Sequence, residues 1–175
     1  MSELSNAQRE FRSAMAKLPA AVNVITTDGA LGPAGMTVSA TCSVTDAPPT
    51  MLVCVNRSSR SHDIFTANGR VAVNVLGADQ DELALHFAGA TKVPTAERFA
   101  EGAWDFGTHG VPVLQDALVA VVGRIVADRT LGSHSVLFVE IDAVHTKEDT
   151  GALVYFQRRF HSLATPSPER VGTGV

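Results

Sequence analysis

The sequence predicts a mainly β protein whose strands form a closed or nearly closed antiparallel barrel with a few peripheral helices. Six or more strand-like runs are separated by turn residues, and few segments have helical periodicity. The regular βαβ alternation of a dinucleotide-binding α/β fold is missing, and so are the phosphate-binding motifs GxGxxG and GxxxxGKS/T. One domain is expected, because 175 residues suffice for one hydrophobic core.

Helical periodicity is clearest near the N-terminus. A helix is predicted over residues 4–18, where Phe11, Met15 and Leu18 recur at three- and four-residue spacing and Pro19 follows as a stop signal. Weaker patterns predict three short helical segments, which are residues 58–68 (ending at Gly69), residues 78–87 and a turn near residues 95–99.

Strands are predicted where β-branched residues cluster, or alternate with other residues, between turn signals. Val119, Val121 and Ile125, for example, share one face of a long predicted strand. The predicted strands cover residues 21–27, 35–45, 51–56, 70–76, 114–127, 134–144 and 153–156.

Composition and charge argue against nucleic-acid-binding and membrane proteins. The chain has 14 Lys and Arg against 18 Asp and Glu, whereas nucleic-acid binders normally carry a basic surplus. No apolar run approaches the roughly 20 residues that span a bilayer, and the N-terminus lacks the pattern of a signal peptide. A soluble, cytoplasmic protein is expected, with Cys42 and Cys54 as buried free thiols.

Side chains suited to acid–base or nucleophilic catalysis are scarce: there is no GxSxG motif and no pattern with zinc spacing. Three segments could still hold a ligand. Small hydroxyl residues over 35–45 suit an anionic or carbonyl-rich flat molecule, or form an ordinary polar strand face. His134 begins a strand and is either structural or in contact with a substrate. Residues 155–160 place two arginines between aromatic residues, as a solvated edge or as an anion contact.

Five stretches together resemble the short-chain flavin reductases of two-component monooxygenases. They are FRSAMAKLPAAVNVITTDG, GMTVSATCSVTDAPPTMLVCVNRSS, HFAGAT, GSHSVLFVEI and LVYFQRRFHSL, in the family's order from Phe11 to Leu163. The resemblance implies a split β-barrel that binds flavin, formed by residues 11–163. Residues 1–10 would be a flexible N-terminus and residues 164–175 a disordered C-terminal tail.

The resemblance also implies cofactors and partners. FMN or FAD would bind near the interface of a homodimer, and NADH or NADPH would reduce it. The reduced flavin would then diffuse to a separate flavin-dependent monooxygenase, such as an aromatic hydroxylase of the phenol or 4-hydroxyphenylacetate type. Hydride transfer between two stacked rings needs orientation rather than a general acid or base, which agrees with the scarcity of catalytic side chains.

Carried over by position, the resemblance implies a flavin site and a nicotinamide site, and no metal. The residues along the flavin ring would be Met36, Thr37, Val38, Ser39, Ala40, Ser43 and Val44. The residues beside its ribityl chain, its phosphate and its edge would be Asn56, Ser59, Phe87, Ala88, Gly89 and Lys92. His134 would position the nicotinamide, and Tyr155 and Arg159 would help to close its site.

Two other interpretations stay open. One is a split-barrel enzyme that keeps its flavin and reduces another acceptor, such as a corrinoid or a ferric complex. The other is a flavin-binding module without turnover. The residues expected at the nicotinamide favour the reductase, since a storage module needs no nicotinamide pocket.

Overall fold

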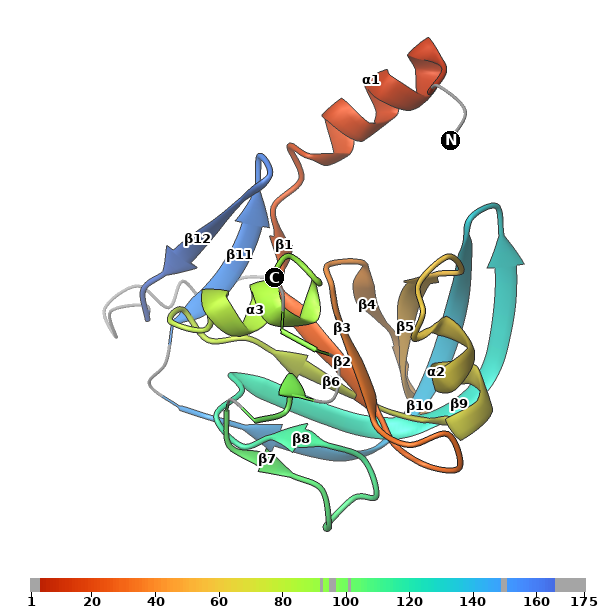
Figure 1. Cartoon of the computed structure of the whole chain (residues 1–175), viewed down its shortest axis with the longest axis vertical. Coiled ribbons are helices and arrows are strands. Elements are labelled where there is room, and N and C mark those ends of the chain that lie inside the picture. Colours follow the sequence, from red (N-terminus) through yellow and green to blue (C-terminus); the bar gives the residue numbers. More distant parts are fainter. Residues whose placement is uncertain (1–3, 92, 95–96, 101, 149–150, 166–175) are drawn as a thin grey trace.

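The computed structural model describes residues 4–91, 93–94, 97–100, 102–148 and 151–165. Figure 1 shows a strongly curved antiparallel sheet as the body of the protein. In sheet order β3-β2-β6-β9-β10-β5-β4, its seven strands are Ala34–Val38, Asn23–Thr27, Arg70–Val75, Val119–Leu131, His134–Thr146, Pro49–Asn56 and Thr41–Asp46. The prediction of a mainly β barrel is confirmed.

The sheet curls because its two edge strands are consecutive in the chain. Only Ser39 and Ala40 separate β3 from β4, so the end of β3 and the start of β4 are at most about 11 Å apart and the two edges meet there. The Ala40 carbonyl accepts a hydrogen bond of 2.9 Å from the Cys54 amide of β5. The Asn23 side chain of β2 donates to the Val38 carbonyl at 3.3 Å and to the Thr41 hydroxyl at 3.2 Å. These contacts join the edges into a barrel.

Two hydrophobic clusters lie on opposite faces of the sheet. In β6, Val71 and Val73 point into the barrel, whereas Ala72 points out toward the second cluster. The inner cluster includes Phe65 of the helix α2 (His62–Asn68), which ends at Gly69 with φ 73°. The outer cluster packs under the helix α3 (Asp81–Phe87) and the short hairpin of β7 (Trp104–Asp105) and β8 (Val113–Leu114).

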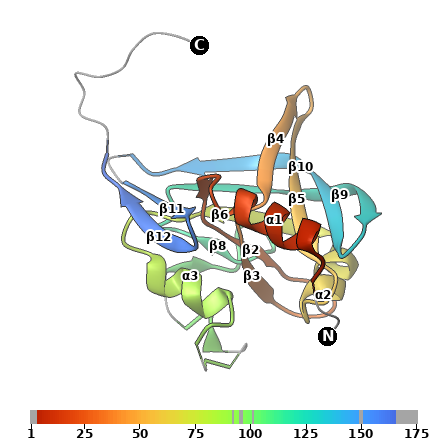
Figure 2. The same cartoon turned by 90° about the horizontal axis from the view of Figure 1, so that it is seen from above.

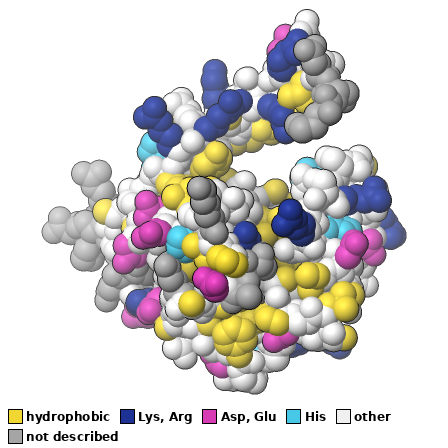
Figure 3. All heavy atoms as spheres, in the orientation of Figure 1, with side chains coloured by type: hydrophobic (Ala, Val, Ile, Leu, Met, Phe, Trp, Pro, Cys, Tyr) yellow, Lys and Arg dark blue, Asp and Glu magenta, His cyan; other side chains and the backbone are white. Residues whose placement is uncertain are grey.

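A smaller sheet packs against the outer cluster through Leu153 and Phe160. It consists of β1 (Ala20–Ala21), β11 (Ala152–Phe156) and β12 (Arg159–Leu163). The helix α1 (Asn6–Met15) begins with Ser5 and Gln8 capping each other's backbone amides, yet it has no buried residue. Figures 1 and 3 show α1 standing away from the sheet. Figure 2 shows the tip of the β4–β5 hairpin projecting past the other strands of the sheet.

The predicted elements agree with the structure in kind, with a few differences. The predicted strand 35–45 is two strands that belong to opposite edges of the sheet. The strands β7 and β12 were not predicted, and the start of the predicted strand 114–127 belongs to the separate strand β8. The two cysteines were expected to be buried, but Cys42 is exposed and Cys54 is only half-buried. The predicted turn near residues 95–99 lies partly outside the described residues.

Candidate functional site

Two hollows lie side by side and share the residues Thr37 and Ala88. The loop hollow, of about 400 Å³, is lined by Gly35, Met36, Thr37, Ser59, Arg60, Ser61, Phe87, Ala88, Gly89 and Arg98. The hairpin hollow, of about 450 Å³, is lined by Val22, Thr37, Val38, Ser39, Leu85, Ala88, Ala90, Tyr155, Arg158, Arg159 and Phe160. Together they form one candidate site along β3.

The position of α3 over β3 depends on a close contact at Gly35. A Cβ atom at this residue would lie 2.5 Å from Cε1 of Phe87, so no larger residue fits without a shift. The Thr37 hydroxyl donates to the Ala84 carbonyl of α3 at 2.6 Å. These two contacts place the turn at Ala88 and Gly89 next to the middle of β3, where the two hollows meet.

β3 also offers backbone groups to a ligand. It lies at the edge of the seven-stranded sheet and pairs only with β2, so about half of its backbone N–H and C=O groups are not used in strand pairing. An edge strand of this kind can hydrogen-bond to the polar rim of a flat ring.

The loop hollow is suited to an anion. Arg60 and Arg98 line it together with the hydroxyl residues Ser59 and Ser61, and none of its lining residues is acidic. Nε of Arg98 is buried and has no hydrogen-bond partner within the described part of the chain. A buried charged donor without a partner is costly, so this atom indicates a missing acceptor such as a phosphate oxygen.

An aromatic cluster holds Arg98 at this place. The neighbouring residue Phe99 packs edge-on against Phe87, with ring centroids 5.2 Å apart, and against Trp104 at the same separation. The segment that carries Arg98 is therefore anchored to the end of α3, although it lies far from β3 in the sequence.

The hairpin hollow is more apolar and is closed on one side by the β11–β12 hairpin. Tyr155 and Phe160 pack with ring centroids 5.5 Å apart, and Val22 and Leu85 supply further apolar surface. Arg158 and Arg159 are the charged residues in its lining. An apolar hollow with aromatic rings and cations at its rim suits a flat heterocycle attached to an anionic group.

The structure brings together ten of the sixteen predicted site residues. They are Met36, Thr37, Val38, Ser39, Ser59, Phe87, Ala88, Gly89, Tyr155 and Arg159. Lys92 lies outside the described residues.

The other five predicted residues line neither hollow of the chain. Asn56 ends β5, and its carbonyl accepts a hydrogen bond of 3.0 Å from the Ser59 amide, so it supports the loop that carries Ser59. His134 pairs with Asn56 across the sheet, and its Nδ1 lies 2.9 Å from the Ser133 hydroxyl. Ala40 lies at the junction of the barrel edges, and Ser43 and Val44 are exposed on β4.

Two cationic residues of the site, Arg60 and Arg98, were not predicted from the sequence, whereas Arg158 lies in the stretch 155–160 that was interpreted as a solvated edge or as an anion contact. Arg60 directly follows Ser59, so the prediction for Ser59 could have been extended to Arg60. Arg98 lies in a stretch without periodicity, and nothing in the sequence connects it with β3. The thiols play no comparable part, because burial and the neighbouring Cys42 raise the pKa of Cys54 and keep it a poor nucleophile.

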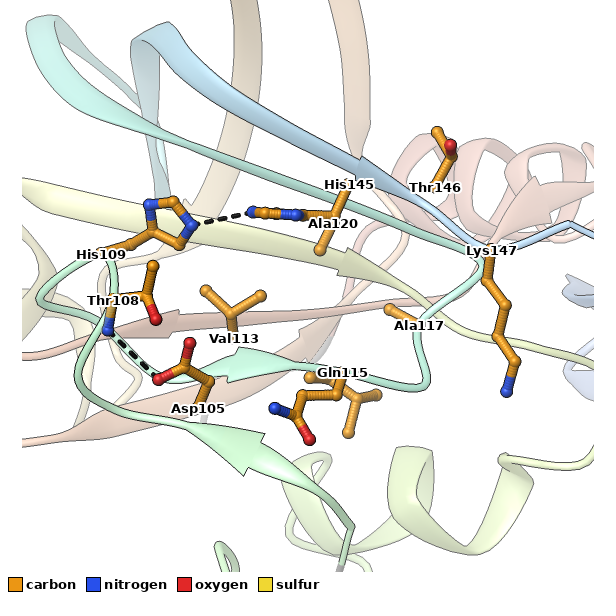
Figure 4. A pocket seen from close by; sticks show the side chains of 11 residues that line it. Asp105, Thr108, His109, Val113, Gln115, Ala117, Ala120, His145, Thr146 and Lys147 are labelled. Atoms are coloured by element: carbon orange, nitrogen blue, oxygen red, sulfur yellow. Dashed lines mark hydrogen bonds between the residues drawn. The ribbon is translucent and has the colours of Figure 1, made fainter.

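A further hollow of about 340 Å³ lies beside the β7–β8 hairpin and contains no predicted residue (Figure 4). His109 and His145 face each other there, with their Nε2 atoms 2.8 Å apart. The Thr108 hydroxyl and the amides of Gly107 and Thr108 donate to Asp105 and lower its pKa. The described residues contain no group of three or more possible metal ligands, so this hollow shows no sign of a metal centre.

The family model described as "Flavin reductase like domain" matches residues 15–164. The 4-hydroxyphenylacetate 3-monooxygenase reductase component of Pseudomonas aeruginosa is 49% identical over 166 residues, which cover 95% of this chain and 98% of that protein. The FMN reductase (NADH) RutF of Stutzerimonas stutzeri is 48% identical over 158 residues, 90% of each chain.

Similarity extends to solved structures. The flavin reductase PheA2 in its native state superposes with a TM-score of 0.82 at 29% sequence identity, and the match covers 93% of this chain and 100% of that one. The matched region includes both hollows and the strands that form them. The chain therefore belongs to the flavin reductase like domain family.

Proposed function

We propose that the protein is an NAD(P)H-dependent flavin reductase that supplies reduced FMN or FAD to a separate monooxygenase. The observation that carries the proposal is the pair of hollows along β3, one suited to a phosphate and the other to a heterocycle, which meet at Thr37 and Ala88. Two relatives named as flavin or monooxygenase reductases, each more than 45% identical, support the same reaction.

In this proposal the flavin lies along β3 with its phosphate in the loop hollow. Met36 to Ser39 line the hollows on the side of the sheet edge, where free backbone groups are available to the ring. Arg98, whose Nε has no partner among the described residues, and Arg60 bind the phosphate, while Ser59 and Ser61 add short hydroxyl donors. The residues present therefore fit a flavin nucleotide.

The hairpin hollow takes the nicotinamide. When both cofactors are bound, the nicotinamide supplies a hydride and the flavin ring accepts it. Tyr155 and Phe160 supply an apolar wall that excludes water, and Arg159 holds the charged part of the dinucleotide. The protein contributes orientation, with Thr37 and Ala88 at the place where the two rings meet.

A homodimer is part of the proposal. The helix α1 has no buried residue, and Phe11 and Leu18 are 64% and 58% exposed. Val44 on the projecting β4–β5 hairpin and Leu131 at the tip of the β9–β10 hairpin are also exposed. A second copy that packs on these surfaces would also bury Ser43, Val44 and His134, which line neither hollow of a single chain.

The partner proposed for the reduced flavin is an aromatic hydroxylase. The relative from Pseudomonas aeruginosa is named as the reductase component of 4-hydroxyphenylacetate 3-monooxygenase, which supports this class. No helix among the described residues is long and apolar enough to cross a membrane. We place the protein in the cytoplasm because its reductant, a reduced nicotinamide dinucleotide, is a cytoplasmic metabolite.

The test is the dependence of NADH oxidation on added flavin. Flavin-free protein is assayed with NADH or NADPH against FMN, FAD and riboflavin, with absorbance at 340 nm as the readout. The proposal predicts that oxidation is weak without flavin and rises with flavin concentration to saturation. Equal rates with and without added flavin would contradict a reductase that treats flavin as a substrate.

A further inference from the structure

The turn of the β11–β12 hairpin has an unusual backbone. Phe156 pairs with Arg159, which leaves a two-residue loop of Gln157 with φ 49° and Arg158 with φ 63°. Within the described part of the chain these are the two residues other than glycine with positive φ. Two-residue hairpin loops of this geometry strongly favour Asn-Gly, because side chains with a Cβ atom are strained in the left-handed region.

The turn is also tied to the rest of the chain by one backbone hydrogen bond. The Gln157 amide donates a hydrogen bond of 2.7 Å to the Ala16 carbonyl, which ties the turn to the segment after α1. This contact uses only backbone atoms, so glycine at either position would keep it. The hydrogen bond therefore does not explain why both loop positions carry long side chains.

Arg158 differs from Gln157 in what its side chain reaches. Arg158 lines the hairpin hollow together with Arg159, whereas Gln157 does not. The lining of this hollow contains no acidic residue, and the guanidinium of Arg158 has no ion pair or hydrogen bond within the described part of the chain. Backbone strain of this kind is concentrated at ligand-binding positions, and the exposed guanidinium of Arg158 at the rim of the hollow is open to an anionic ligand.

Resting on the proposed function, we infer that Arg158 binds the phosphate groups of the nicotinamide dinucleotide and sets the affinity of the enzyme for it. The hairpin hollow, of about 450 Å³, has room for the nicotinamide and its ribose, so the phosphates lie at the rim. The planar guanidinium matches phosphate oxygens in a two-pronged contact. Arg158 contributes to the lining of the hollow from the turn of the hairpin.

The test is the variant Arg158→Gly, because it should make the fold more stable and the binding of NADH weaker. Glycine relieves the left-handed strain, so the melting temperature should rise by about 2–4 °C. Loss of the guanidinium should raise the KM for NADH about tenfold, with kcat and the KM for FMN within twofold of the wild type. A residue with a structural role alone would lower the melting temperature or leave the KM unchanged.

Gln157→Gly is the matched control, since it relieves the same strain without touching the hollow. It should raise the melting temperature equally and leave the KM for NADH unchanged. Arg158→Asn is a second variant, because asparagine tolerates the left-handed region and lacks the charge. It should show the same rise in KM as Arg158→Gly.

Comparing different reductants shows which phosphate group Arg158 contacts. A similar rise in KM for NADH and NADPH points to the diphosphate that both contain, whereas a rise confined to NADPH points to its 2′-phosphate. Reduced nicotinamide riboside has no phosphate, so its KM should not change. An unchanged KM for both dinucleotides, or an equal rise for the riboside, would overturn the role of Arg158. Absence of flavin-dependent NADH oxidation in the wild type would instead refute the proposed function.

Discussion

Arg98 is the residue whose environment most directly indicates a bound anion, since its buried Nε has no partner within the described residues. Arg98→Met should raise the KM for FMN about tenfold, because a hydrogen bond to a charged group contributes about 1.5–3 kcal/mol. The KM for riboflavin, which lacks the phosphate, should stay unchanged.

A suitable control for Arg98→Met is Arg129→Met on the exposed part of β9, away from both hollows. It should change neither KM. Equal effects of Arg98→Met on FMN and riboflavin would show that Arg98 supports the fold rather than the phosphate.

Gly35 determines how closely α3 approaches β3. Gly35→Ala should lower the free energy of unfolding by about 1–3 kcal/mol, because its Cβ atom would lie 2.5 Å from the Phe87 ring. Flavin affinity should fall as well, since Phe87 and Gly35 both line the loop hollow. Urea denaturation and flavin titration measure the two effects.

The control for Gly35→Ala is Gly107→Ala, where the nearest atom to an added Cβ is 3.7 Å away. This variant should be as stable as the wild type within about 0.5 kcal/mol. If Gly35→Ala were equally neutral, the packing of α3 on β3 would not be the cause of the shape of the site.

At the residue scale, the sequence predicted the neutral part of the site better than its charged part. Thr37, Phe87 and Ala88 lie in short motifs whose resemblance to the family is local, and the structure brings them together. Arg98 reaches the site through packing of Phe99 on Phe87, a contact between distant segments that no local pattern encodes. Arg158 was named only as one of two arginines in residues 155–160, because the left-handed backbone that distinguishes it is seen only in the structure.

Among the elements, α1 has an apolar stripe that is not buried by the described part of the chain. Phe11→Glu should shift the protein from dimer to monomer in sedimentation velocity, because it places a charge on the surface proposed to meet a second copy. Arg12→Gln on the same helix is the control and should leave the dimer intact. A wild-type protein that is monomeric and fully active would contradict the proposed dimer.

The strands β6 and β10 are connected by an ion pair between Arg70 and Asp142, with two N–O contacts of 2.8 Å. Hydrogen bonds from Arg70 lower the pKa of Asp142 below its ordinary value of 3.8. The carboxylate therefore stabilises the fold above pH 3.8, and this contribution is lost as the pH falls through the lower pKa of the folded state.

Asp142→Asn should accordingly cost about 0.5–1 kcal/mol of unfolding free energy at pH 7, a small effect because both partners are partly exposed to solvent. The difference from the wild type should shrink as the pH falls below 3.8 and disappear once the pH has passed the lower pKa of the carboxyl in the folded state. Asp128→Asn, on an exposed part of β9, should have no comparable effect. A difference that stayed constant down to pH 2 would exclude the ion pair as the cause.

Strand periodicity predicted most of the elements, and the exceptions have physical reasons. The break at Ser39 and Ala40 carries no proline or glycine, so the predicted strand 35–45 had no visible end. The strand β12 is short and carries Arg159 and His161, which do not produce a clear alternation. The helix α1 was predicted from its apolar stripe, although that stripe is not packed within the chain.

For the whole molecule, closure of the barrel is what makes the site possible. Because β3 and β4 are joined by two residues, β3 is held at the sheet edge with free backbone groups. The helix α3 and the β11–β12 hairpin then approach β3 from two sides and form the two hollows. The sequence predicted the barrel, whereas the meeting of these three elements depends on tertiary packing.

The most direct measurement is a crystal structure of the protein with FMN and NAD⁺ bound. It should show the FMN phosphate within hydrogen-bond distance of Arg98 in the loop hollow and the flavin ring along residues 36–39, with the nicotinamide stacked on it in the hairpin hollow. Flavin bound elsewhere, for example in the hollow beside His109 and His145, with β3 left free, would contradict a site built on β3.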